Sequence, residues 1–155
     1  MTTKVISVGP EMLLRKAMDI LLENGFNGLP VLDKDGFLIG ILTEFDVIVA
    51  GLTIYVPAFR RLSDNPDFYK DKGFMKEDLG RILDMKVKEV MNTEPLVFKE
   101  DASVEDAIKA FSDHHKVNPI PIVDDNRKVL GIISRYDVIK FVRSTISSLT
   151  KSLSY

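Results

Sequence analysis

A serine and an aspartate three residues apart, Ser134 and Asp137, precede an apolar segment in the sequence GIISRYDVI (131–139). This spacing is the signature of a capping box, in which the two side chains hydrogen-bond backbone N–H groups at a helix N-terminus. A hydroxyl group and a carboxylate at a helix N-terminus are also suitable groups for holding a ribose phosphate. One copy of the pattern does not distinguish capping from ligand binding.

The same pattern occurs a second time, at Thr43 and Asp46 in the sequence GILTEFDVI (40–48). Residues 30–48 and 121–139 align without a gap at an offset of 91 residues (121 − 30 = 91), and seven of the aligned pairs are identical. Most of the remaining pairs are similar in size and polarity. Chance explains this poorly, so the chain contains two copies of one supersecondary unit.

Both copies predict the same order of elements, namely strand, helix, strand, strand and helix. In the first copy a strand over residues 4–8 leads into a helix, and a hairpin with an Asp- and Gly-rich turn then leads into a second helix at Thr43. The first of these helices is predicted from apolar residues at helical spacing, which are Leu13, Leu14, Ala17, Met18 and Leu21. The second copy repeats the order from residue 95, with Asp101 or Ser103 as the first N-cap.

The fold class that these elements predict is α+β, with two tandem β-α-β-β-α repeats. The repeats should pack on each other, because neither can bury both faces of its sheet alone. We assign residues 1–52 to the first repeat, 53–86 to a linker, 87–146 to the second repeat and 147–155 to a C-terminal tail. A connection of this length usually folds locally or has a function, and apolar residues at helical spacing near its end favour a local helix.

Composition excludes several classes of function. Of the 155 residues, 45% are hydrophobic, and 21 Lys and Arg against 23 Asp and Glu leave a net charge of −2. A balanced charge provides no field for nucleic acid or an anionic membrane. The absence of cysteine removes disulfides, thiol catalysis and thiolate metal sites. With no signal-peptide core and no apolar run near the ~18–20 residues that span a bilayer, we expect a soluble, cytoplasmic protein.

The layout resembles a tandem pair of CBS domains, known as a Bateman module. The resemblance rests on the two repeats, the strands GLPVLD and PIPIVD, the glycine-containing strands LIGILT and VLGIIS, and the endings TEFD and SRYD. The segment VKEVM before the second copy resembles the short helix that precedes many such repeats, and the first copy lacks a full lead-in of this kind. The linker is not explained by the resemblance.

The resemblance implies a regulatory module that is not an enzyme. Family members pack their repeats sheet to sheet around a pseudo-two-fold axis and leave two clefts. Those clefts often take adenosine derivatives such as AMP, ADP, ATP or S-adenosylmethionine, and no metal is required. Two modules commonly form a homodimer through their exposed helices.

The resemblance also implies which residues hold the ligand. In the family pattern the aspartate binds the ribose hydroxyls, the Ser or Thr lies near the phosphate, and the polar residue three before the strand proline approaches the phosphate. In this sequence those positions are Asn27, Thr43, Asp46, Asn118, Ser134 and Asp137. The chemistry is suitable, because a carboxylate accepts hydrogen bonds from both ribose hydroxyls and a helix N-terminus offers N–H groups to phosphate.

The two copies differ at the residue that follows the hydroxyl side chain, which is Glu44 in the first copy and Arg135 in the second. A cation beside a phosphate pocket favours binding, and a carboxylate there repels the ligand. We therefore predict that the site of Ser134, Arg135 and Asp137 binds a phosphorylated nucleotide. The other site should be empty, structural, or suited to a less anionic ligand.

Other residues give weaker predictions. His114 and His115 lack the convergent partners that a metal site needs, and the arginines of FRR (59–61) are expected in a solvated loop, from which one of them could reach a phosphate. No constellation for catalysis is present. The main alternative to an adenosine sensor is a ligand-free scaffold for dimerisation and protein interaction, in which the T/S-x-x-D motifs serve only as helix caps.

Overall fold

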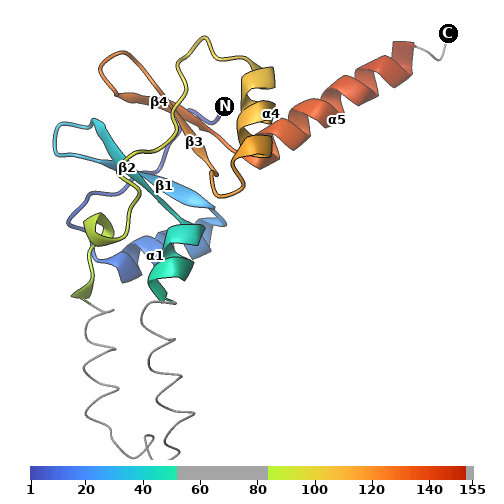
Figure 1. The fold of residues 1–155 in the computed structure, drawn as a ribbon. Coiled ribbons are helices and arrows are strands. Elements are labelled where there is room, and N and C mark those ends of the chain that lie inside the picture. The colour runs from blue at the N-terminus through green and yellow to red at the C-terminus, as the bar shows by residue number, and fades with distance from the viewer. Residues whose placement is uncertain (52–83, 153–155) are drawn as a thin grey trace, which may run out of the picture.

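The computed structural model describes residues 1–51 and 84–152, and in these ranges the expected α+β architecture is present (Figure 1). The first repeat contains α1 (Leu14–Asn24), β1 (Gly28–Leu32) and β2 (Leu38–Thr43), followed by helical residues 44–51. A short 3₁₀ helix (Val87–Glu89) leads to the second repeat, which contains α4 (Val104–Asp113), β3 (Ile120–Val123), β4 (Val129–Ile133) and α5 (Arg135–Ser152). The predicted linker helix lies outside the described residues.

Each repeat contains one antiparallel hairpin, as predicted. β1 pairs with β2 from Gly28 opposite Thr43, and β3 pairs with β4 from Ile120 opposite Ile133. The two turns are built alike, because an aspartate at the same position of each copy accepts hydrogen bonds from two backbone N–H groups. Asp33 accepts from residues 35 and 37, and Asp124 accepts from residues 126 and 128.

The lead-in strands are shorter than the sequence predicted. Val8 forms a single parallel bridge to Val31, and Phe98 forms a single parallel bridge to Ile122. The residues before the predicted strands hydrogen-bond to the hairpin of the other repeat. Thr2 pairs with Ile132 of β4 in the second repeat, and Asn92 pairs with Ile41 of β2 in the first, each through two backbone hydrogen bonds of 2.9 Å.

These crossings explain why both copies have a glycine in the second strand of the hairpin. A Cβ atom on Gly40 would lie 2.8 Å from the backbone oxygen of Asn92, and one on Gly131 would lie 3.0 Å from that of Thr2. A side chain at either position would push the crossing segment away. The glycines therefore allow each lead-in to lie against the opposite repeat.

The two repeats meet through equivalent positions, as a pseudo-two-fold axis requires. Phe37 bridges to Lys128, and a Cβ on Gly28 would lie 2.8 Å from Cδ of Pro119. Each of these pairs is separated by the repeat offset (128 − 37 = 91 and 119 − 28 = 91). The hairpins therefore face each other around this axis, and the predicted packing of sheet against sheet is confirmed.

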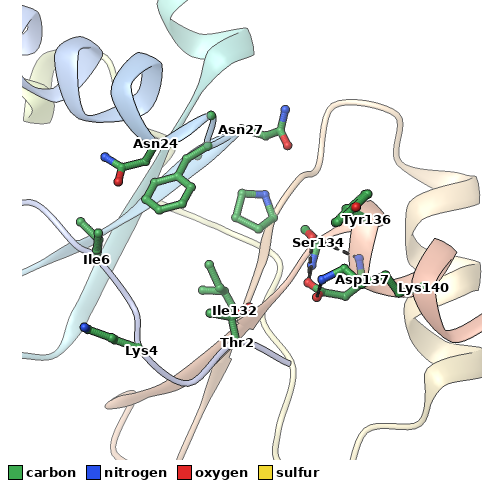
Figure 2. A pocket seen from close by; sticks show the side chains of 14 residues that line it. Thr2, Lys4, Ile6, Asn24, Asn27, Ile132, Ser134, Tyr136, Asp137 and Lys140 are labelled. Atoms are coloured by element: carbon green, nitrogen blue, oxygen red, sulfur yellow. Dashed lines mark hydrogen bonds and ion pairs between the residues drawn. The ribbon is translucent and has the colours of Figure 1, made fainter.

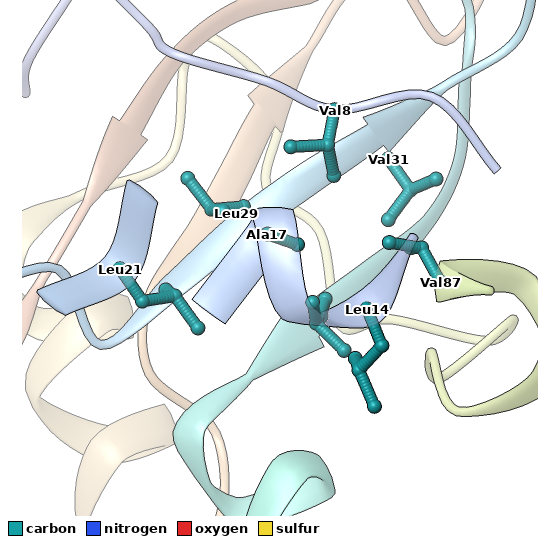
Figure 3. Packing of buried hydrophobic residues seen from close by; sticks show 8 residues of the cluster. Val8, Leu14, Ala17, Leu21, Leu29, Val31 and Val87 are labelled. Atoms are coloured by element: carbon teal, nitrogen blue, oxygen red, sulfur yellow. The ribbon is translucent and has the colours of Figure 1, made fainter. Parts of the chain in front are cut away.

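The larger apolar cluster lies in the first repeat (Figure 3). It consists of Val8, Leu14, Ala17, Leu21, Leu29, Val31, Leu42 and Val87. Three of these residues are on α1, at positions that the helical spacing predicted. Val87 is fully buried in this cluster although it begins the second repeat, so the segment after the linker completes the core of the first repeat. Burial of one such aliphatic side chain contributes about 1.5–3 kcal/mol.

The second repeat has a smaller buried cluster, made of Ala107 and Phe111 on α4 and Ile120 on β3. α4 begins at the N-cap Ser103, one of the two predicted caps, which forms a capping box with Asp106. α5 continues past residue 146 to Ser152 and extends away from both hairpins (Figure 1). No helix in the described ranges has the length and hydropathy to cross a membrane.

Candidate functional site: two cavities between the repeats

The Ser134–Asp137 motif forms a complete capping box at the start of α5. The Oδ2 atom of Asp137 accepts hydrogen bonds from the backbone N–H of Ser134 at 2.9 Å and from its hydroxyl at 2.7 Å. The backbone N–H of Asp137 donates to Oγ of Ser134 at 3.3 Å. All these carboxylate contacts use Oδ2, so the cap leaves Oδ1 for another partner.

The Thr43–Asp46 motif has the same geometry. Oδ2 of Asp46 accepts from the backbone N–H of Thr43 at 2.8 Å and from its hydroxyl at 2.6 Å. The backbone N–H of Asp46 donates to Oγ1 of Thr43 at 3.3 Å. Both motifs are therefore genuine helix caps, and the cap alone does not distinguish the two sites.

The carboxyl group of Asp137 is ionised more readily than an ordinary aspartate. Its burial works to raise the pKa, but the hydrogen bonds from Ser134 and the charge of Lys140 outweigh that effect, so the pKa lies below its usual value of 3.8. Nζ of Lys140 lies 3.6 Å from Oδ1. The oxygen that the cap does not use therefore belongs to an ionised carboxylate and lies beside the cation of Lys140.

A cavity of about 410 Å³, here called cavity one, opens beside this cap (Figure 2). Ser134, Tyr136 and Asp137 of the second repeat lie on one side, and the loop between α1 and β1 lies on the other. Its lining residues are Thr2, Lys4, Ile6, residues 24–28, Pro119, Ile132, Ser134, Tyr136, Asp137 and Lys140. Both repeats and the crossing lead-in therefore contribute to one site.

Among the predicted phosphate contacts, Asn27 lines cavity one together with Ser134 and Asp137. Its side chain donates a hydrogen bond of 3.0 Å to Oε2 of Glu44, which fixes it just before the start of β1. The structure thus combines the asparagine of the first repeat with the capping box of the second. Local sequence spacing could not predict that the asparagine of one repeat would join the capping box of the other.

The equivalent combination forms a smaller cavity of about 160 Å³, here called cavity two. Asn118 from the second repeat joins Thr43 and Asp46 from the first, and its Oδ1 accepts from the backbone N–H of Arg135 at 3.2 Å. The remaining lining residues are Ile41, Phe45, Asn92, Pro95, Leu96, Lys116, Val117 and Pro119. All seven predicted site residues except Arg135 line one of the two cavities.

Arg135 lies outside cavity one. Its guanidinium donates to the carbonyl oxygens of His114 at 3.4 Å and His115 at 2.7 Å, and it lies 5.8 Å from the ring centre of Phe111. It therefore ties the C-terminal end of α4 to the start of α5. The expected cation beside the capping box is instead Lys140, one helical turn after Asp137.

The sequence analysis missed two cations of cavity one, Lys4 and Lys140. Lys140 follows Asp137 by three residues, a spacing that places both side chains on one face of a helix and could have identified it. Lys4 had no such signal, because its position depends on the crossing of the lead-in to the second repeat. In the described ranges, no three His, Asp or Glu side chains gather closely enough to hold a metal ion.

Comparison with protein families gives a match to the CBS domain family over residues 1–52 and 87–144. Among curated relatives, the uncharacterised protein MJ1426 of Methanocaldococcus jannaschii is 34% identical over 126 residues, which cover 76% of this chain and 74% of that protein. The chloroplast CBS domain-containing protein CBSX1 of Arabidopsis thaliana is 29% identical over 136 residues, and the chain covers 57% of its length.

Solved structures agree in fold. The structure of CBSX2 in complex with AMP superposes with a TM-score of 0.68 at 22% identity, covering 94% of this chain and 93% of that one. The CBS domain pair of MJ0100, in complex with 5′-methylthioadenosine and S-adenosyl-L-methionine, superposes with a TM-score of 0.65 at 20% identity and covers 93% and 92%. At this identity the likeness is one of fold.

Proposed function

This chain belongs to the CBS domain family, with two copies in tandem, and we propose that it is a regulatory module that binds an adenosine-type ligand in cavity one. The ligand class is AMP, ADP, ATP or S-adenosylmethionine. Binding changes the position of one repeat relative to the other, and a partner protein recognises that change. The cytoplasmic location expected from the sequence stays a prediction.

The observation that carries this proposal is the composition of cavity one. Oδ1 of Asp137 is available to accept hydrogen bonds from ribose hydroxyls once Lys140 moves aside. Phe26, Ile6 and Ile132 supply an apolar surface for the base, and the N-terminus of α5 offers a positive dipole end to phosphate. Lys4 and Lys140 add cationic charge for an anionic ligand.

The proposed mode of signalling follows from where the lining residues come from. Cavity one is bounded by residues of both repeats, so a ligand that contacts both stabilises one relative arrangement over others. A ligand shifts such an equilibrium only by its difference in affinity between the two arrangements. Asp137 and Asn27 lie on opposite repeats and are the contacts through which that difference would arise.

Relatives support the class of ligand. CBSX2 has been crystallised with AMP, and the pair from MJ0100 with 5′-methylthioadenosine and S-adenosyl-L-methionine. Inosine-5′-monophosphate dehydrogenase of Methanocaldococcus jannaschii is 29% identical over 136 residues, but the chain covers only 21% of that enzyme. We therefore propose a regulatory role for this chain, with catalysis belonging to other parts of such enzymes.

A second candidate, the ligand-free dimerisation scaffold, is favoured by α5. Its apolar side chains Val142 and Ile146 are exposed, on a helix that extends away from both hairpins (Figure 1). Dimerisation through this face does not exclude ligand binding in cavity one, and we propose a homodimer that also binds ligand.

Calorimetric titration of the purified chain with AMP, ADP, ATP and S-adenosylmethionine tests the proposal, with GMP as the control for the base. We expect at least one adenosine compound to bind and GMP to bind more weakly. A ligand present at about 100 times its Kd should also add about 2.7 kcal/mol to the free energy of unfolding. Failure of all four adenosine compounds to bind at millimolar concentration would favour the scaffold.

A further inference from the structure

The two cavities are lined by equivalent positions of the two repeats but differ more than twofold in volume, about 410 Å³ against about 160 Å³. Both cavities contain a capping box and an asparagine. Several other equivalent pairs differ, and two of these differences concern groups that could join the walls of a cavity. Gly25 in cavity one corresponds to Lys116 in cavity two (116 − 25 = 91), and Tyr136 in cavity one corresponds to Phe45 in cavity two (136 − 45 = 91).

In cavity two, the side chain of Lys116 reaches across from the second repeat to the first. Its Nζ atom lies 4.6 Å from the ring centre of Phe45, which follows Thr43 by two residues. A cation over an aromatic face is attracted by the ring quadrupole. This contact joins the two walls of cavity two beside the capping box of Asp46.

In cavity one, the equivalent position has no side chain. Gly25 ends α1 with a φ of 63°, and a Cβ atom built on it would find nothing within 4 Å. Tyr136 also carries a cation over its ring at 4.6 Å, but that cation is Lys140 of the same helix. Neither residue therefore bridges the walls of cavity one.

We propose that the contact between Lys116 and Phe45 closes cavity two, so that the chain binds one adenosine-type ligand and holds its second site latent. This inference rests on the proposed function of cavity one. The second site keeps the equivalent polar residues, because Thr43, Asp46 and Asn118 occupy the positions of Ser134, Asp137 and Asn27. Withdrawal of the Lys116 side chain is the step that makes it available.

The test is the stoichiometry of AMP binding, measured by calorimetry on the full chain and on the variant Lys116→Ala. Lys116 is exposed, so its truncation removes the bridge without disturbing a buried contact. We expect one AMP per wild-type chain and two per Lys116→Ala chain. The double variant Lys116→Ala with Asp46→Ala should return to one, and Lys109→Ala, which removes an exposed lysine of α4, should match the wild type.

Other outcomes separate the two claims. Two AMP molecules on the wild type, or one on both the wild type and Lys116→Ala, would overturn the closure of cavity two and leave the proposed function standing. If Lys116→Ala bound AMP more weakly at the Asp46 site than the wild type does, Lys116 would be a ligand contact. That result would also overturn the closure of cavity two. An absence of AMP binding to every variant would contradict the proposed function and the inference together.

Discussion

The two carboxylate oxygens of Asp137 have separate surroundings. Oδ2 belongs to the helix cap, where it accepts two hydrogen bonds from Ser134, and Oδ1 faces Lys140 at 3.6 Å. Capping and ligand binding are therefore compatible at this residue, because they use different oxygens. The cap also orients the carboxylate, so a ligand would meet a group that is already fixed.

The ionisation of Asp137 gives a prediction about stability in acid. Its folded-state pKa lies below the usual 3.8, so its contribution to stability is fully present above that value and is lost as the pH falls through the folded-state pKa. We expect the free energy of unfolding to fall more steeply below about pH 4 in the wild type than in Asp137→Asn, which cannot ionise. Urea unfolding of the wild type and of Asp137→Asn between pH 6 and pH 3 measures the two pH dependences. Parallel curves would show that the residue has no such linkage.

Arg135 shows what residue spacing cannot predict. Its position next to Ser134 suggested a cation beside the phosphate, but the side chains of adjacent residues leave a helix in different directions. The guanidinium instead meets the carbonyl groups of His114 and His115 at the end of α4. The charge expected at the site is present, but it comes from Lys140 on the same helix face as Asp137.

At the level of elements, the hairpins and helices were predictable because their signals are local. The aspartate turns, the apolar spacing of α1 and the capping box at Ser103 all act within a few residues. The lead-in strands were overestimated, and their pairing is long-range. Val8 and Phe98 each form a single bridge, and Thr2 and Asn92, which precede the predicted strands, pair with the opposite repeat; such pairing leaves no periodic pattern in the sequence.

Helix α5 carries the prediction about assembly. Val138, Val142 and Ile146 recur at i, i+4 and i+8, which places them on one face, and Val142 and Ile146 are exposed. If this face is the dimer seam, Ile146→Glu should convert a dimer to a monomer, because a charge on each copy would be buried in the seam. Light scattering after size-exclusion chromatography measures the mass.

The matched control for that prediction is Ser148→Glu, which adds the same charge two residues later on α5, on the face opposite Ile146. It should leave the mass unchanged if the seam is confined to the apolar face. A wild-type chain that is monomeric at all accessible concentrations would contradict the predicted homodimer. So would a dimer that persists in Ile146→Glu.

At the level of the whole molecule, the internal repeat predicted that two copies would face each other around a pseudo-two-fold axis. Contacts between equivalent positions, such as Phe37 with Lys128, confirm that arrangement. Comparison of the two copies also predicted that the two sites differ, but it based the difference on Glu44 and Arg135 and did not predict the unequal volumes of the two cavities. The contact of Lys116 with Phe45, to which we attribute the closure of cavity two, joins residues that are distant in the chain.

The most direct test of the central claim compares AMP binding in two matched variants, Asp137→Ala and Asp46→Ala. Each removes the carboxylate of a capping box with the same geometry, so the cost to the helix cap should be similar in the two variants. Loss of charge-assisted hydrogen bonds in cavity one should weaken AMP binding by Asp137→Ala about tenfold to a hundredfold. Asp46→Ala should bind AMP like the wild type. Unchanged affinity in Asp137→Ala, with binding lost in Asp46→Ala, would contradict the assignment of the ligand to cavity one.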